Sequence, residues 1–208
     1  MKVIALVTAK GGSGKSTLAA NLAVAAEATG EQVFLLELDR QGTLARWIDR
    51  RTADTPAFDR ISSASELVPA LDTLDKQGFS LVVLDTAGHD SALATAAIQA
   101  ADLCLVPTRP TPADLEATQP TLEAIQSTRR KFAFVLNQTP VRSSRLSEAA
   151  AGLRVLGILA EPNIAQRNDY QDALGQGLGV TEFNPSGKAA TELAALWAWV
   201  QRKLKGKA

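Results

Sequence analysis

The glycine-rich stretch at residues 8–17, with the sequence TAKGGSGKST, constrains the fold of this chain more than any other segment. It follows a short apolar run at residues 3–7 and precedes a long pattern rich in alanine and leucine. This order predicts a strand, a glycine loop and the start of a helix. Glycines in such a loop let successive backbone N–H groups turn inward, where they bind a polyphosphate together with the positive end of the helix.

The same loop predicts the residues that hold a nucleotide and a metal ion. Lys15 is placed to reach the β- and γ-phosphates, and the Ser16 hydroxyl to take one coordination position on Mg²⁺. The alternative is a ligand-free turn, but such a turn does not require Lys15 and Ser16 in register with the glycines. The stretch fits a variant of G-x-x-x-x-G-K-[ST] in which Ala9 replaces the first glycine. The other predicted nucleotide contacts in the loop are Gly11, Gly12, Ser13, Gly14 and Thr17.

A second lysine, Lys10, precedes the glycines and gives the pattern K-G-G-x-G-K-[ST]-[ST]. This pattern resembles the deviant Walker A motif of the ParA/MinD/Soj family of partitioning and positioning ATPases. The resemblance implies ATP and Mg²⁺ as cofactors. It also implies that Lys10 reaches across a homodimer, formed with ATP, to the nucleotide of the other subunit.

Asp85 ends the clearest buried-strand pattern in the chain, the run LVVLD at residues 81–85. Open α/β sheets bind their ligands at the carboxyl ends of strands, so this acid is expected beside the phosphate loop. We expect Asp85 to act on Mg²⁺ through a water molecule. The next residues form a loop in which Gly88 is expected near the γ-phosphate. For His89, the only histidine, we weigh a general-base role against an exposed position in that loop.

Asp39 ends a second apolar run, at residues 32–38. The segment LELDRQG resembles the D-x-D-P-Q switch of the family, and this resemblance implies that Asp39 orients the attacking water. Glu37 replaces the first Asp of that switch, and Arg40 replaces its usual Pro. The alternative for Asp39 is an N-terminal cap of a helix that begins near Thr43.

Asn137 follows another apolar run, at residues 132–136. The family resemblance implies that its side chain reads the adenine base, because an amide both donates and accepts hydrogen bonds. An ordinary turn residue at the end of a strand is the alternative.

The charge balance decides where a nucleic-acid contact would have to lie. Lys and Arg together number 22, as do Asp and Glu, so any DNA contact needs a local basic patch. The family resemblance places such a patch near a closing I-x-x-R turn, whose arginine is Arg167 here. Arg142 and Arg145 are expected to extend the patch, which would become continuous when ATP joins two subunits. A structural cap or a surface ion pair is the alternative for Arg167.

Strand and helix patterns alternate along the chain, which predicts one α/β domain over residues 1–208 with a doubly wound, mostly parallel sheet. Ser63 is expected to cap a helix that Gly78 closes, and Pro120 to break a helix or begin a new one. The last helix, at residues 186–204, has an apolar stripe that we assign to the core: Leu193, Leu196, Trp197 and Val200.

The short chain most resembles ParF-like members of the family, which implies a cytoplasmic, nucleoid-associated protein. We expect it to bind DNA without sequence preference, to segregate plasmids, chromosomes or protein clusters, and to respond to a ParB-like or cargo adaptor. No apolar segment approaches the ~18 residues of a membrane span. A MinD-type membrane-associated ATPase and a soluble regulatory ATPase are the alternatives. An iron–sulfur reductase needs more than one cluster cysteine, and the chain has only Cys104.

Overall fold

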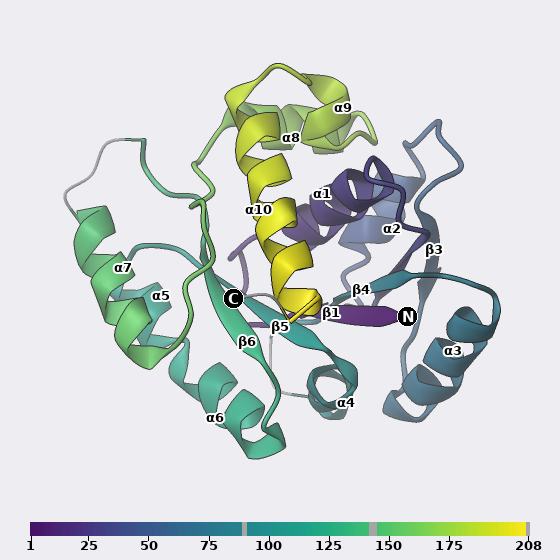
Figure 1. Ribbon diagram of the computed structural model, residues 1–208, viewed down its shortest axis with the longest axis horizontal. Coiled ribbons are helices and arrows are strands. Elements are labelled where there is room, and N and C mark those ends of the chain that lie inside the picture. The colour runs from purple at the N-terminus through teal and green to yellow at the C-terminus, as the bar shows by residue number, and fades with distance from the viewer. Residues whose placement is uncertain (89–90, 142–144, 207–208) are drawn as a thin grey trace.

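A computed structural model describes residues 1–88, 91–141 and 145–206, without the Arg145 side chain. The predictions for His89 and Arg142 therefore fall outside the described residues. Every strand pairing in the six-stranded sheet is parallel, and the strand order is β3-β2-β4-β1-β5-β6 (Figure 1). The predicted fold class is confirmed. The strands are β1 (Lys2–Leu6), β2 (Val33–Glu37), β3 (Ala57–Arg60), β4 (Leu81–Asp85), β5 (Leu103–Thr108) and β6 (Phe132–Leu136).

Helices cover both faces of the sheet, as the nearly continuous apolar strands require. Helices α1 (Lys15–Glu27), α2 (Thr43–Ile48), α8 (Asn168–Gly175), α9 (Val180–Phe183) and α10 (Lys188–Leu204) pack on one face. The other face carries α3 (Ala64–Lys76), α4 (Ala92–Ala100), α5 (Pro112–Glu116), α6 (Gln119–Thr128) and α7 (Arg145–Leu156).

The strand register brings separate parts of the sequence to one edge of the sheet. Leu6 of β1 pairs with Asp85 of β4, and Asp85 also pairs with Glu37 of β2. Three strands therefore end at the same level. The glycine loop after β1, the acid at the end of β4 and the segment after β2 meet there, as open α/β sheets place their ligand sites.

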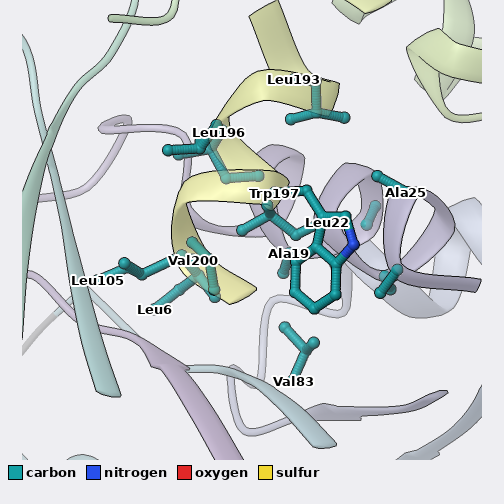
Figure 2. Close-up of a cluster of buried hydrophobic side chains, with 14 of the residues drawn as sticks. Leu6, Ala19, Leu22, Ala25, Val83, Leu105, Leu193, Leu196, Trp197 and Val200 are labelled. Carbon is teal, nitrogen blue, oxygen red and sulfur yellow. The ribbon is translucent and has the colours of Figure 1, made fainter. Parts of the chain in front are cut away.

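Helix α10 packs its apolar stripe against α1 and the sheet. Figure 2 shows Leu193, Leu196, Trp197 and Val200 of α10 facing α1 and the strand residues beneath it. The prediction that this stripe belongs to the core is confirmed, and its apolar surface is not available to a membrane. Within the described residues, no helix combines the length and the hydrophobicity that crossing a bilayer would need.

Helix boundaries follow the predicted capping signals. The Ser63 side chain accepts a hydrogen bond from the Ser65 N–H at the start of α3, and Gly78 beyond its end has a φ of 90°. Pro120 begins a new helix, because α5 ends at Glu116 and Pro120 lies in the first turn of α6.

We predict that Leu196→Ala lowers the free energy of unfolding by about 2–5 kcal/mol, because it leaves a cavity in a packed core. Leu196 is 0% exposed. The matched control is Val155→Ala, since Val155 is 86% exposed and its truncation should change stability by less than about 0.5 kcal/mol. Urea unfolding followed by circular dichroism measures both values, and equal values for the two variants would contradict the packing described here.

Candidate nucleotide-binding site

The glycine loop joins β1 to α1 with a backbone that side chains would strain. Gly12 and Gly14 have φ values of 75° and 92°, in the left-handed region that favours glycine. A Cβ on Gly14 would lie 2.3 Å from the Asn137 Nδ2 atom. The loop therefore depends on glycine at position 14 both for its own conformation and for the close approach of β6.

Two consecutive amides after β6 hold the carbonyl groups of this loop. Asn137 is buried, and its Nδ2 donates a hydrogen bond of 2.7 Å to the Ser13 carbonyl oxygen. The Nε2 of Gln138 donates a bond of 3.0 Å to the Gly12 carbonyl oxygen. The sequence patterns did not predict these loop contacts, because they join residues that lie far apart in the chain.

Two adjoining cavities lie along the loop. The first, of about 490 Å³ and here called the phosphate pocket, is lined by Gly11, Gly12, Gly14, Lys15, Ser16, Thr17, Asp39, Arg40, Gln41, Thr43, Gly88 and Gln138. The second, of about 130 Å³ and here called the side pocket, is lined by Gly14, Thr17, Leu18, Asn137, Gln138, Ala165, Gln166, Arg167, Tyr170 and Gln171. Because three residues line both cavities, the two adjoin, and together they are here called the elongated site.

Lys15 lies almost buried in the loop, where its Nζ donates to the carbonyl oxygens of Thr8 and Lys10 at 3.4 Å each. Burial lowers the pKa of Lys15, and the charges of Asp85 and Asp39 oppose that change. Gly88 comes close as well, because a Cβ there would lie 3.3 Å from Lys15 Nζ. The structure thus brings Lys15 and the segment after β4 together, and the expected closeness of Gly88 to a γ-phosphate stays a prediction.

Asp85 is fully buried, and neither of its carboxylate oxygens has a hydrogen-bond partner among the described residues. The Ser16 hydroxyl lies near this carboxylate without meeting the geometry of a hydrogen bond. Burial raises the pKa of Asp85 to about 7, although that hydroxyl and the Lys15 ammonium act to lower it. A buried carboxylate without a partner is costly unless a cation or hydrogen bonds offset the burial. This carboxylate next to a serine hydroxyl fits the oxygen ligands and retained waters of Mg²⁺.

The two acids at the end of β2 differ in their contacts: Glu37 is the last residue of the strand, and Asp39 lies in the loop that follows. Asp39 accepts a hydrogen bond of 2.9 Å from the Gln41 N–H and so stabilises the turn. Glu37, rather than Asp39, caps α2: its carboxylate accepts 2.8 Å from the Leu44 N–H and forms an ion pair of 3.0 Å with Arg60. The helix-cap alternative for Asp39 is therefore wrong.

Lys10 forms an ion pair within its own chain. Its Nζ lies 3.2 Å from Asp114 Oδ2, and Arg109 Nε lies 3.0 Å from Asp114 Oδ1. Burial alone would raise the pKa of Asp114, but hydrogen bonds from Thr111, Arg109 and Lys10 outweigh it and lower the pKa. The sequence patterns did not predict the contact between Lys10 and Asp114, which joins two segments that lie far apart in the chain.

Of the three arginines predicted to bind DNA, only Arg167 has a side chain among the described residues. Arg167 pairs with Glu192 through its Nη2, and its Nε donates to the same carboxylate at 3.2 Å. This ion pair is the alternative weighed for Arg167. Arg145 is the first residue of α7, and Arg142 lies outside the described residues. Their part in DNA binding stays a prediction.

The chain is similar in sequence to a known protein family and to named proteins over most of its length. The family model described as VirC1 protein matches residues 1–173. The maintenance of carboxysome distribution protein A of Gloeobacter kilaueensis is 36% identical over 209 residues, covering 98% of this chain and 94% of that protein. The protein of the same name from Halothiobacillus neapolitanus is 28% identical and covers 91% of each chain.

Among solved structures, the septum site-determining protein MinD of Pyrococcus horikoshii, complexed with Mg-ADP, has the same fold. Its TM-score to this chain is 0.80 at 18% identity, over 100% of this chain and 98% of that chain.

We predict that Asp85 makes the ligand-free protein lose stability as the pH rises. The folded state holds a proton on Asp85 up to about pH 7, whereas the usual carboxyl pKa is 3.8, so this contribution is present below pH 3.8 and is lost as the pH rises to about 7. Urea unfolding of the wild type and of Asp85→Asn at a series of pH values measures it. The free energy of unfolding of Asp85→Asn, measured relative to that of the wild type, should rise with pH. A difference between the two free energies that does not change with pH would contradict a buried carboxylate without a partner.

Proposed function

Since the chain belongs to the VirC1 family and to the ParA/MinD group of P-loop ATPases, we propose that it is an ATP-dependent dimerising ATPase that positions a large cargo. The observation that carries this proposal is the phosphate pocket. The glycine loop, Lys15 and Ser16 line this pocket at the carboxyl edge of the sheet, and the buried Asp85 ends the neighbouring strand β4. Each of these groups suits the binding of a magnesium nucleotide.

The elongated site fits the shape of a nucleotide. We place the phosphates on the N–H groups of residues 11–17 with Lys15, and the base and sugar in the side pocket. Gln138, Gln166 and Tyr170 line the side pocket. The Tyr170 hydroxyl is buried without a hydrogen-bond partner among the described residues, so a ligand there would satisfy it. Asn137 lines the same pocket while its Nδ2 holds the loop, which leaves its Oδ1 for the base.

In this proposal Mg²⁺, when bound, neutralises charge on the phosphates and orients them. The Ser16 hydroxyl would hold it directly, and Asp85 would hold one of its waters. Ionised Asp85 would then gain the partner that it lacks in the free chain.

Dimerisation requires Lys10 to leave Asp114 for the nucleotide of the second subunit. This exchange does not leave the Asp114 carboxylate without partners, because Arg109 still pairs with Oδ1 and the Thr111 hydroxyl still donates a hydrogen bond to Oδ2. A buried charge that keeps its partners avoids most of the cost of breaking an ion pair. The arrangement therefore suits a lysine that changes partners with ATP.

Hydrolysis would use Asp39. Its Oδ1 is occupied by the Gln41 N–H, and no bond to its Oδ2 occurs within the described part of the chain. Asp39 lines the phosphate pocket, and in this proposal its free oxygen orients the attacking water. The proposed rate is slow without a partner, because Lys10 completes the charge at the γ-phosphate only in the dimer.

The names of two relatives support the proposed class of cargo. Two of them are named for maintaining carboxysome distribution, and we carry positioning of a protein cluster or plasmid over to this chain as the proposal. An adaptor on the cargo would stimulate hydrolysis, and nucleoid DNA would be the track. The buried stripe of α10 argues against a MinD-type membrane anchor at that helix.

We predict that Lys15→Ala abolishes nucleotide binding and ATP hydrolysis, while Lys10→Ala still binds ATP but remains monomeric. Lys15 supplies the charge for its own nucleotide, and Lys10 that for the partner's. Isothermal titration calorimetry measures the binding, and size-exclusion chromatography with light scattering in ATP and Mg²⁺ measures the dimer. Asp114→Asn is the matched control, because it releases Lys10 without removing it and should still dimerise. A Lys10→Ala dimer of normal strength would remove the cross-subunit role.

A separate prediction concerns DNA. With ATP the protein should retain DNA at low salt without sequence preference, and rising salt should weaken binding steeply, because phosphate contacts release counterions. Arg167→Ala should lose that retention while it still dimerises. Glu192→Gln should keep or strengthen it, because this variant frees Arg167 from its ion pair.

A mobility-shift assay with and without ATP tests both variants. Full retention by Arg167→Ala would exclude Arg167 from the patch. A parent protein that never binds DNA with ATP would favour a soluble regulatory ATPase.

A further inference from the structure

Arg40 lies at the rim of the phosphate pocket, between Asp39 and Gln41. Its side chain is exposed, and neither an ion pair nor a side-chain hydrogen bond engages it in the described ranges. An exposed arginine that lines a pocket proposed to hold phosphates, and that has no partner of its own among the described residues, is a candidate ligand contact.

Two other arginines hold the backbone on which Arg40 sits. Arg46 Nη1 donates 2.7 Å to the Gln41 carbonyl oxygen, and Arg60 Nη2 donates 3.4 Å to the carbonyl oxygen of Arg40 itself. Arg60 is in turn paired with the buried Glu37. The loop is therefore braced from α2 and β3, and the guanidinium of Arg40 is the one that these contacts leave free.

The shape of the elongated site decides which part of a nucleotide Arg40 would meet. The side pocket and the phosphate pocket share Gly14, Thr17 and Gln138, so the base end lies on that side. Arg40 lines only the phosphate pocket, together with Lys15 and Gly88. This position is the end where the last phosphate of a chain would lie.

The balance of charge at that end of the pocket favours one more positive group beside a terminal phosphate. Lys10 is neutralised by Asp114 in the free chain, whereas Asp39 contributes a negative charge beside the pocket. Lys15 is then the other cation that lines the phosphate pocket. A terminal phosphate next to Asp39 would be repelled by that carboxylate unless a positive group lies close by.

We propose that the Arg40 guanidinium binds the terminal phosphate and makes the free chain distinguish a nucleoside triphosphate from a diphosphate. The planar guanidinium matches phosphate oxygens with two parallel hydrogen bonds. The inference rests on the proposed nucleotide binding. It is a property of this chain, since the switch pattern that the segment resembles has a proline at this position and so has no charge to offer.

The test compares Mg²⁺ with AMPPNP, a non-hydrolysable triphosphate, and Mg²⁺ with ADP by isothermal titration calorimetry. Arg40→Ala should weaken AMPPNP binding by about tenfold, the size expected for a hydrogen bond to a charged group. It should change ADP binding by less than about twofold, because ADP lacks the phosphate concerned. Arg40→Lys should recover part of the loss, because the charge remains but the paired hydrogen bonds do not.

Arg50→Ala is the matched control. Arg50 is an exposed arginine just beyond the end of α2, and it lines neither cavity. Its loss should leave both affinities unchanged, which separates a specific contact from a general loss of positive charge.

Four results would contradict the proposals, and each shows which proposal fails. An Arg40→Ala variant that binds AMPPNP as the wild type does, or that loses AMPPNP and ADP equally, overturns the role of Arg40 alone. A wild-type protein that binds neither nucleotide overturns the proposed function and this inference with it. Wild-type binding that survives Lys15→Ala overturns the placement of the phosphates, and with it the contact to Arg40.

Discussion

The parallel register of β1, β2 and β4 is the constraint on which the site depends. Leu6, Glu37 and Asp85 lie level with one another across these strands. A shift of one residue in either pairing would turn every side chain of a strand to the opposite face of the sheet. Asp85 would then no longer lie near Lys15, and the segment that carries Asp39 and Arg40 would no longer lie beside the glycine loop. The core residues on both faces of the strands hold the register, so packing and site geometry are fixed by the same contacts.

The buried acids near the site differ in whether the chain supplies their partners. Glu37 accepts a hydrogen bond from the N-terminus of α2 and forms an ion pair with Arg60. Asp114 forms ion pairs with Lys10 and Arg109 and accepts a hydrogen bond from Thr111. Asp85 has no hydrogen-bond partner in the described part of the chain, and burial raises its pKa to about 7. Satisfied acids brace the loops, whereas an unsatisfied one is a place where a ligand lowers the free energy. This contrast sets Asp85 apart from the acids whose partners the chain itself supplies, and it supports the proposal that Asp85 acts on a bound metal ion.

The candidate site was only partly predictable from the sequence. Lys15, Ser16 and Asp85 follow from strand, loop and helix signals that lie within a few residues of each of them. The hydrogen bond from Asn137 to Ser13 joins residues 124 positions apart, and no local pattern encodes it. The sequence offered Asp39 only as the alternative cap of α2, whereas the side chain of Glu37, at the end of β2, reaches the first turn of that helix.

The sequence by itself determined the alternation of strands and helices, the glycine loop and the acids at two strand ends, because each of these depends on short-range propensity and periodicity. Only the tertiary structure decided which charges have partners. Lys10 forms an ion pair with Asp114, and Arg167 forms one with Glu192. Arg40 lines the phosphate pocket and has no ion pair among the described residues. Nothing in the sequence around these three basic residues distinguishes them in this respect. The reason is physical: a charge interacts with whatever lies within a few ångströms of it, and that distance is set by packing between elements rather than by separation along the chain.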